Sequence, residues 1–391
     1  MKFRRKVPVP LIAKGVEAIF LVASGAIVAL SVSGLASAQT AAPTVSLVAV
    51  ASGLANPWAV AFLPGGQFLV TERPGRMRVI DANGRAGPAL TGVPTVAAGG
   101  QGGLLDVVTD AGFERNRQIY FCFSEPSSAA GSGANSTALA RATLSGDSRS
   151  LQNVQVIFSQ RPKVNSSLHF GCRIVQAADG NLFLTLGDRF HRKEDAQKLD
   201  NHHGKIIRIA PDGTVPAGNP FVSQSGALPE IWSYGHRNAQ GATLGPEGAL
   251  WMHEHGPQGG DEVNVPQPGA NYGWPVVTYG ENYGGGKIGE GNSKPGLVPP
   301  VHYWVPSIAP SGMAFLTSTR YGTAWQGSLF VGSLKFGSLH RLEVAGGKVQ
   351  REEKLLQGSG ERIRDVRQGP DGLLYMVTDS PQGRLLRLQP G

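Results

Sequence analysis

The sequence is poor in cysteine, in charge and in long hydrophobic runs. Two cysteines among 391 residues cannot build a disulfide scaffold. Charged residues make up 16%, well below the roughly one quarter of an average globular protein. Only the N-terminus has an apolar run near membrane-spanning length, which excludes a protein with several transmembrane helices. The hydrophobic fraction of 41% still suffices for a large core, so the chain is predicted to be globular.

Several common catalytic signatures are also missing. The sequence contains no G-x-S-x-G elbow, no Walker A loop, no H-E-x-x-H and no C-x-x-C. It also lacks the strand, G-x-G-x-x-G and helix unit that binds dinucleotides. Any chemistry must therefore use another cofactor or none.

Residues 1–38 have the pattern of a bacterial export signal. A basic segment precedes the apolar stretch 18–35, and an A-x-A cleavage site ends at Ala38. We expect the mature chain, 39–391, to be periplasmic or secreted, with no stable membrane insertion after cleavage. Retention of the segment as an N-terminal membrane anchor is the alternative, because its length is close to that of a membrane span.

Removal of the signal changes the charge and the environment of the cysteines. The signal holds five of the 36 Lys and Arg and one of the 28 Asp and Glu, which leaves a net charge of +4. This small charge, with no block of basic residues, does not predict nucleic-acid binding. In an oxidising compartment Cys122 and Cys172 either pair or remain buried thiols, and both outcomes stay open.

A turn with glycine or a polar pair, followed by a short alternating strand, recurs six times. Its copies are 64–71, 116–121, 178–185, 246–252, 325–331 and 370–377. The spacing of roughly 60 residues suits a four-stranded blade with a long loop. We therefore predict an all-β, six-bladed propeller as the single catalytic domain, with a pair of β-sandwiches as the alternative. The segments 124–140 and 281–300 are expected to be loops at the channel mouth.

Polar residues cluster around the predicted strands. His169 precedes one of them, and imidazole suits a general base near neutral pH, although a lone histidine is more often structural. Four cations, at Arg237, Lys335, Arg362 and Arg364, would suit a polyanionic ligand if they converge; scattered surface cations are the alternative.

The segment 253–262 allows two kinds of metal site. His253 and His255 stand at i and i+2, a spacing that would suit a transition metal if both lie on one strand face. Backbone carbonyls of the following Gly-Pro turn would instead suit Ca²⁺. The residues alone leave both open.

Several segments together resemble the soluble dehydrogenases for glucose and sorbosone that depend on pyrroloquinoline quinone (PQQ), and most of all the periplasmic aldose sugar dehydrogenases. The resemblance extends from about residue 46 to 390. The segments that carry it include Gly100-Gln101-Gly102-Gly103, His169-Phe170-Gly171-Cys172-Arg173, Trp232-Ser233-Tyr234-Gly235-His236-Arg237-Asn238, Glu254-His255-Gly256-Pro257 and Arg362-Ile363-Arg364-Asp365.

The resemblance implies a six-bladed propeller that oxidises aldose sugars at the C1 hydroxyl to lactones, with PQQ, Ca²⁺ and an external electron acceptor. His169 is implied as the base that takes the hydroxyl proton while hydride passes to the quinone, and Arg237 as the group that polarises the quinone oxygen. The resemblance also implies PQQ ligands at Gln101, Asn238, Lys335, Arg362 and Arg364. It implies that the carbonyls of Gly256 and Pro257 bind Ca²⁺ and that Asp261 supports their turn. Tyr303 and Trp304 are implied as aromatic residues that face the sugar.

Two departures from the family pattern and two rival functions need to be considered. The segment 281–300 is short and rich in glycine, so a second, structural Ca²⁺ site is left open. In the glucose dehydrogenase branch an Asp precedes the base, whereas Leu168 stands here, so the pKa of His169 is left open. A metal-dependent propeller lactonase would need acidic ligands at the mouth, which the cations disfavour. A non-catalytic sugar-binding propeller would not need His169 together with four cations.

Overall fold

The fold is described by a computed structural model over residues 44–129 and 131–391. Within these ranges no helix has the length and hydropathy that a membrane crossing requires. The predicted export signal, 1–38, and its cleavage site lie outside the described residues. Both therefore stay predictions.

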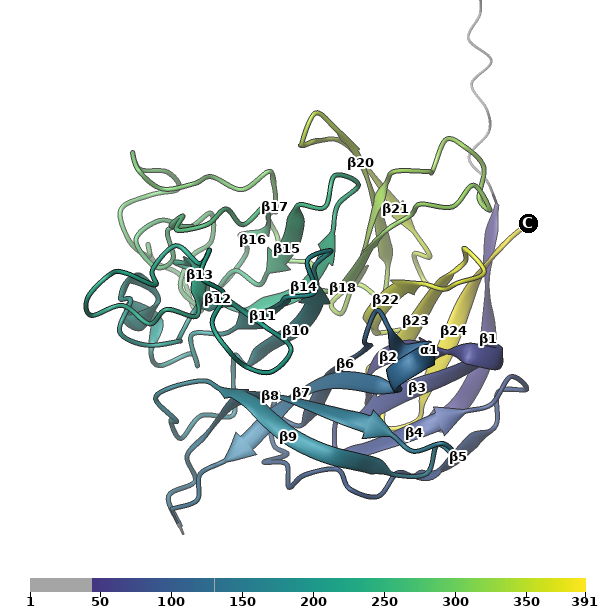
Figure 1. The fold of residues 1–391 in the computed structure, drawn as a ribbon. Helices are drawn as coiled ribbons and strands as arrows, with labels where there is room; N and C mark the ends of the chain where they lie inside the picture. The colour runs from purple at the N-terminus through teal and green to yellow at the C-terminus, as the bar shows by residue number, and fades with distance from the viewer. Residues whose placement is uncertain (1–43, 130) are drawn as a thin grey trace, which may run out of the picture. The chain divides into compact units, whose positions relative to one another are not determined.

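The described residues contain twenty-four strands, which form six antiparallel four-stranded sheets (Figure 1). The first three sheets are β2 (Pro57–Leu63), β3 (Gln67–Glu72), β4 (Arg76–Ile80) and β5 (Ala86–Ala89); β6 (Leu104–Thr109), β7 (Gln118–Pro126), β8 (Asn135–Leu144) and β9 (Leu151–Ser159); and β10 (Gly171–Gln176), β11 (Leu182–Leu186), β12 (Lys205–Ile209) and β13 (Ile231–Tyr234).

The other three are β14 (Ala239–Leu244), β15 (Leu250–Glu254), β16 (Asp261–Asn264) and β17 (His302–Trp304); β18 (Pro310–Phe315), β19 (Leu329–Ser333), β20 (Leu339–Ala345) and β21 (Lys348–Leu355); and β22 (Ile363–Gln368), β23 (Leu374–Thr378), β24 (Gly383–Pro390) and β1 (Val45–Leu54). The short helical segments are α1 (Phe113–Asn116), η1 (Pro64–Gly66) and η2 (Lys193–Gln197).

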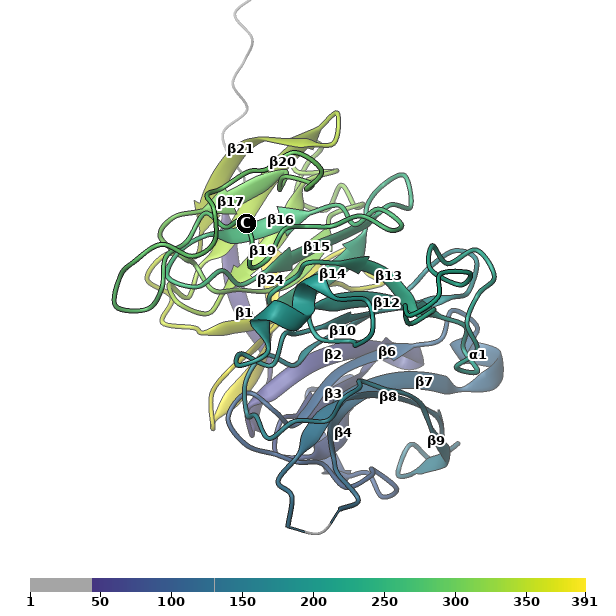
Figure 2. The same cartoon turned by 90° about the vertical axis from the view of Figure 1, so that its left-hand side faces the viewer.

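The six sheets are the blades of a propeller. The first strand of each sheet, from β2 to β22, packs against the first strand of the next, and β22 packs against β2 (Figure 1). The N-terminal strand β1 pairs with β24 and completes the last sheet, which joins the two ends of the described chain (Figures 1 and 2). The predicted six-bladed β-propeller is confirmed.

Each sequence repeat spans the turn between the first and second strands of one blade. The copy at 178–185, for example, runs from the end of β10 into β11, and the copy at 370–377 runs from β22 into β23. The second strands are almost wholly buried, with every residue of β11, β15, β19 and β23 in the interior. The repeat is therefore visible because burial demands apolar residues after each turn.

Of the two segments predicted to be loops, one is largely strand and the other lies in a long connection. The segment 124–140 is mostly strand, because β7 and β8 continue on both sides and leave only 127–134 as a turn. Ser124, Ser136, Ala138 and Ala140 lie in the paired strands, whereas the other Ser and Ala of the segment fall between them in the sequence. The connection is therefore shorter than the predicted loop. By contrast, 281–300 lies in the long connection 265–301 between β16 and β17.

Buried ion pairs connect three blades at the centre of the ring. The guanidinium of Arg173, 2% exposed, lies 3.1 Å from Asp106 and 2.9 Å from Asp365. Arg367 binds the same two carboxylates. Two positive and two negative charges thus neutralise each other where desolvation would make an unpaired charge costly.

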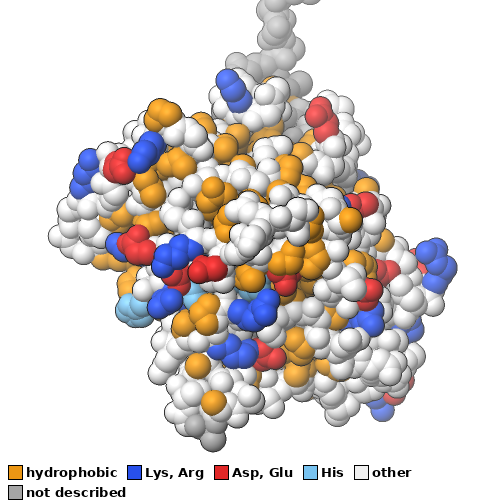
Figure 3. Space-filling model, turned by 60° about the vertical axis from the view of Figure 1, so that its left-hand side comes forward, with side chains coloured by type: hydrophobic (Ala, Val, Ile, Leu, Met, Phe, Trp, Pro, Cys, Tyr) orange, Lys and Arg blue, Asp and Glu red, His pale blue; other side chains and the backbone are white. Residues whose placement is uncertain are grey.

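The exterior shows no extended patch of one charge on the face drawn in Figure 3. Lys and Arg side chains stand among Asp and Glu in small mixed groups on that face (Figure 3). This distribution agrees with the small net charge expected of the mature chain.

Cys122 of β7 and Cys172 of β10 form a disulfide between neighbouring blades. The alternative of two free thiols is thereby excluded. Because the bond closes a chain segment with a sequence separation of 50, we expect the double variant Cys122→Ser/Cys172→Ser to lose about 2–4 kcal/mol of unfolding free energy. Urea denaturation with and without a reductant tests this: reduction should lower the stability of the wild type and leave the variant unchanged.

Candidate active site

The residues of interest lie in loops at one end of the channel. The chain enters each first strand from this end, and the second strand returns to it, so residues before the first strand meet residues after the second. His169 precedes β10, Asn238 precedes β14, and Lys335 follows β19. Side chains distant in sequence are thus brought to a common mouth by the blade geometry.

A cavity of about 330 Å³ opens among these loops. Its walls include His169, Asp188, Arg237, Pro257 and Trp274. This volume lies at the lower end of the range found for small-molecule sites. The structure thus brings the predicted base, the predicted quinone-polarising arginine and one predicted Ca²⁺ ligand to the same cavity.

Asp188 orients the imidazole of His169. The Asp188 Oδ1 atom lies 2.6 Å from Nδ1 of His169, and a carboxylate only accepts, so Nδ1 carries the proton and Nε2 keeps a lone pair. The carboxylate is itself fixed, since Oδ1 accepts the main-chain N–H of Phe190 and Oδ2 accepts the indole N–H of Trp274 at 2.8 Å. Asp188 therefore supplies the orienting carboxylate that Leu168 cannot.

Burial keeps the imidazole neutral. His169 is 5% exposed, and its burial lowers the pKa below the usual range. The bond to Asp188 opposes this shift, whereas the positive charges of Arg237 and Arg189 add to it. The lowered pKa favours the neutral ring at neutral pH, with Nε2 able to accept a proton.

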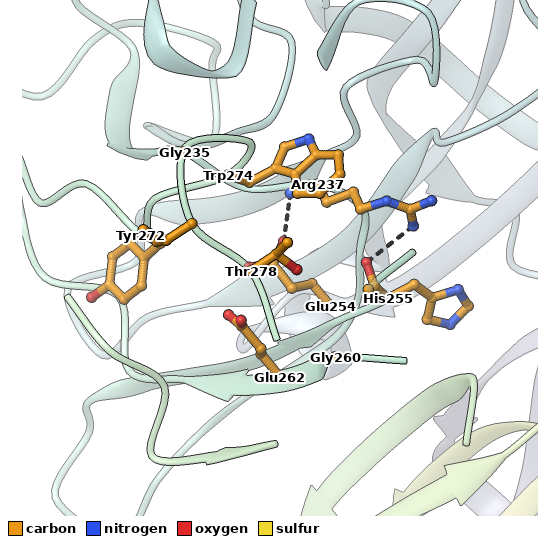
Figure 4. A pocket seen from close by; sticks show the side chains of 11 residues that line it. Gly235, Arg237, Glu254, His255, Gly260, Glu262, Tyr272, Trp274 and Thr278 are labelled. Atoms are coloured by element: carbon orange, nitrogen blue, oxygen red, sulfur yellow. Dashed lines mark hydrogen bonds between the residues drawn. The ribbon is translucent and has the colours of Figure 1, made fainter. Parts of the chain in front are cut away.

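Arg237 reaches the same cavity from the loop before β14. Its main-chain N–H donates to Glu254, and its guanidinium donates to the carbonyl of His255 at 3.1 Å (Figure 4). The guanidinium also lies 5.3 Å from the centroid of the Trp274 ring. Its Nε is buried and has no hydrogen-bond partner within the described ranges.

The remaining predicted PQQ ligands join in a chain of contacts around the mouth. Gln101 accepts the main-chain N–H of His169 at 2.8 Å, and the Oδ1 of Asn238 accepts that of Gly171 at 3.1 Å. Asn238 also contacts Gln240, whose Oε1 accepts a hydrogen bond from Arg364.

Asp379 joins the two predicted arginines. Arg362 and Arg364 both bind its Oδ2, at 3.1 and 2.9 Å. Burial acts to raise the pKa of Asp379, but the two arginines outweigh it and lower the pKa to about 2. Arg362 also donates to the carbonyl of Leu334, beside the exposed Lys335. Arg362 and Arg364 thus meet at one carboxylate, which neutralises part of their charge, and Arg362 also contacts the residue before Lys335. Of the four predicted cations, only Arg237 lines the cavity of His169.

Hydrogen bonds to the side chain of Asp261 stabilise the Gly256-Pro257 turn. Its Oδ1 accepts the N–H of Gly256 at 2.9 Å, and its Oδ2 accepts the N–H of Ile308 and the hydroxyl of Ser307. No hydrogen bond of the described residues ends on the carbonyl oxygens of Gly256 or Pro257.

The two histidines before this turn do not form a pair. His253 is fully buried in β15, whereas β15 ends before His255, whose Nε2 donates to the carbonyl of Pro310. Among the residues that the structure describes, no group of three or more His, Cys, Asp or Glu side chains has the arrangement of a metal site.

The acidic residues Glu254 and Glu262 line a second, small pocket, which shares Arg237 with the cavity of His169 (Figure 4). Glu254 accepts hydrogen bonds from His236 and Arg237. Burial raises the pKa of Glu262 well above its usual value, and the charge of Glu254 adds to the effect.

The predicted sugar-facing aromatics do not reach the cavity that contains His169. Trp304 is 6% exposed, packs in the core between blades and donates its indole N–H to Glu352. Tyr303 points to the other face of β17, where it stacks on Tyr279 at 4.0 Å between ring centroids. The aromatic rings that do line the cavity are those of Phe190, Trp274 and Tyr283.

Sequence reasoning missed Asp188, Trp274 and Asp379. The strand register explains the position of both aspartates, but the sequence alone did not fix that register. Gly171 pairs with Leu186, so the residues two positions outside this pair, His169 and Asp188, meet. The pair Ile363 and Thr378 likewise brings the neighbouring Arg362 and Asp379 together.

Comparisons with known proteins agree with this architecture. Residues 54–387 match the sequence profile of the family described as Glucose / Sorbosone dehydrogenase. The chain is 45% identical over 361 residues to the aldose sugar dehydrogenase YliI of Escherichia coli (strain K12), covering 91% of this chain and 96% of the relative.

Two solved structures extend the comparison. The soluble aldose sugar dehydrogenase of Escherichia coli, in its apo form, superposes with a TM-score of 0.86 at 44% identity, covering 89% of this chain and 100% of the other. The PQQ-bound aldose sugar dehydrogenase of Streptomyces coelicolor gives a TM-score of 0.72 at 29% identity, with coverage of 89% and 100%. The family expected from the sequence is confirmed: this chain is an oxidoreductase that belongs to the glucose/sorbosone dehydrogenase family.

Proposed function

We propose that the protein is a PQQ- and Ca²⁺-dependent aldose dehydrogenase that oxidises the C1 hydroxyl of sugars to lactones. The observation that carries this proposal is the His169–Asp188 pair, which faces the same cavity as Arg237. The names of the relatives support an aldose as substrate and PQQ as cofactor.

The cationic residues fit the carboxylates and quinone oxygens of PQQ. The Nε atoms of Arg237 and Arg364 are buried without hydrogen-bond partners, and Lys335 takes part in no ion pair within the described ranges. Arg362, Arg364 and Lys335 would hold the carboxylates, while Gln101 and Asn238 would contact the ring system. When bound, PQQ supplies the two-electron acceptor for the hydride of C1.

The carbonyls of Gly256 and Pro257 fit Ca²⁺, which prefers oxygen ligands and accepts backbone carbonyls. A side chain at Gly256 would collide with the carbonyl of Gly259 at 2.2 Å, so the turn is built for close backbone packing. Ca²⁺ at this turn would supply a Lewis acid beside Arg237.

The chain's own residues explain how the hydroxyl is activated. His169 accepts the hydroxyl proton at Nε2, and Asp188 stabilises the imidazolium that forms. Arg237 places a fixed positive charge where negative charge develops on the electron acceptor. The lactone leaves, and an external acceptor removes the electrons. The predicted export signal supports a location of this reaction in the periplasm or outside the cell.

Reconstitution tests the proposed function. Residues 39–391 are expressed, stripped of metal and mixed with PQQ, with Ca²⁺ or with both, and dye reduction by a panel of aldoses is followed. We expect turnover only when both are present. Tight PQQ binding without turnover on any aldose contradicts the substrate class, and failure to bind PQQ contradicts the cofactor and brings the lactonase and binding-protein alternatives forward.

A further inference from the structure

We propose that Arg189 is a positioning residue for the catalytic base: its guanidinium binds the main chain just before His169 and stacks on the side chain just after it. The inference rests on the proposed role of His169. It concerns a residue adjacent to Asp188, so two consecutive residues hold the base, one through its ring and the other through its backbone.

The main chain at the base needs such support. His169 has φ +50°, and the facing residues Arg189 and Phe190 have φ +59° and +67°. These left-handed conformations cost about 1–2 kcal/mol each for residues with a side chain. They persist only where surrounding contacts outweigh the cost. The position of the imidazole therefore depends on what holds these two turns together.

The side chain of Arg189 makes the contacts that join the turns. Its Nε donates to the carbonyl of Leu168 at 3.1 Å, and its NH2 donates to the carbonyl of Ser166. The guanidinium also lies 3.7 Å from the ring centroid of Phe170. The residues on both sides of His169 thus contact one planar group.

Further contacts fix the guanidinium itself. NH2 also donates to Oδ1 of Asn135, on β8 of the neighbouring blade, at 2.7 Å. The hydroxyl of Ser166 donates to the carbonyl of Arg189, so the two turns are bonded in both directions. Arg189 is among the largest fully buried side chains, and it stays charged at neutral pH because burial lowers its pKa only to about 10.

An arginine is needed for this arrangement. The planar fork reaches two carbonyls and stacks on an aromatic ring at once, whereas an ammonium group is a point charge on a flexible stem. Arg189→Lys keeps the charge and loses the stacking and the fork. We therefore expect both Arg189→Met and Arg189→Lys to misplace the imidazole.

The test compares these variants with a matched control. Arg341 is a second buried arginine: it donates to Ala324 and Ser328, lies 5.5 Å from the Trp325 ring and belongs to β20. We expect Arg189→Met and Arg189→Lys to lower kcat by about 10²-fold. KM for the sugar and the Kd of PQQ, measured by fluorescence titration, should stay within about 3-fold of wild type. Arg341→Met should lose a similar amount of Tm and keep its kcat.

Asn135→Ala provides a second, milder test in case the Arg189 variants do not fold. It removes one partner of the guanidinium and leaves Arg189 in place. We expect a smaller loss of kcat, about 3- to 10-fold. Unchanged kcat in Arg189→Lys and Asn135→Ala would overturn the proposal, as would an equal loss of kcat in Arg341→Met. His169→Gln is measured in parallel: if it retains full activity, the assignment of the base fails instead.

Discussion

Replacing His169 by glutamine is expected to lower kcat by about 10²–10⁴-fold, the usual contribution of a general base. Glutamine keeps the main-chain N–H that donates to Gln101 but cannot accept a proton at the position of Nε2. The Kd of PQQ should be unchanged, because the predicted cofactor contacts come from other side chains. Single-turnover kinetics with saturating PQQ and Ca²⁺ measure the loss at the chemical step.

His191→Gln is the matched control for this change. His191 lines the same cavity and is exposed, without a carboxylate partner among the described residues. It should retain kcat within a small factor. Loss of PQQ binding in His169→Gln, or an equal loss of kcat in His191→Gln, would contradict the assignment of the base.

Replacing Asp188 by asparagine is expected to lower kcat by about 10²-fold or more, since the equivalent change in a Ser-His-Asp triad costs about 10⁴-fold. The carboxylate accepts from three donors: His169, Phe190 and Trp274. An amide has one acceptor atom. If the NH₂ takes the place of Oδ2, it faces the indole N–H of Trp274. If it takes the place of Oδ1, it faces the N–H of Phe190 and forces the imidazole into the tautomer with the proton on Nε2.

The pH profile separates this effect from simple misfolding. Burial already lowers the pKa of His169, so the acid limb of kcat/KM should lie below 6.5, with activity lost as the pH falls through the pKa. The Asp188 carboxylate opposes that shift, so Asp188→Asn should move the limb to still lower pH. An acid limb that does not move would mean that another group titrates.

Much of the fold was visible in the sequence, because each blade repeats the same local demand. A turn must be followed by a buried second strand, and the copies at 246–252 and 325–331 show this as a glycine-containing turn before apolar residues. Strand boundaries were less predictable. The two ends of 124–140 pair as strands, because their partners across the hairpin and not their composition decide the structure there.

The site was predictable in its chemistry and less so in its geometry. His169, Arg237 and the three other cations were identified by residue type and resemblance. The partner of the base was not, because Leu168 stands where that partner was sought and Asp188 comes from the far side of a hairpin. Trp304 was expected at the sugar, but alternation along β17 turns it into the core and leaves Tyr303 outside.

By itself the sequence determined the six-fold repeat and the all-β architecture, and it identified a candidate base and four candidate cations, because periodicity and residue type are local properties. Only the tertiary structure decided which charges meet. Strand register places Asp188 on His169 and Asp379 between two arginines, and ring closure brings Asp106, Arg173 and Asp365 together from three blades. These contacts join residues up to 192 positions apart, a distance over which no sequence period carries information.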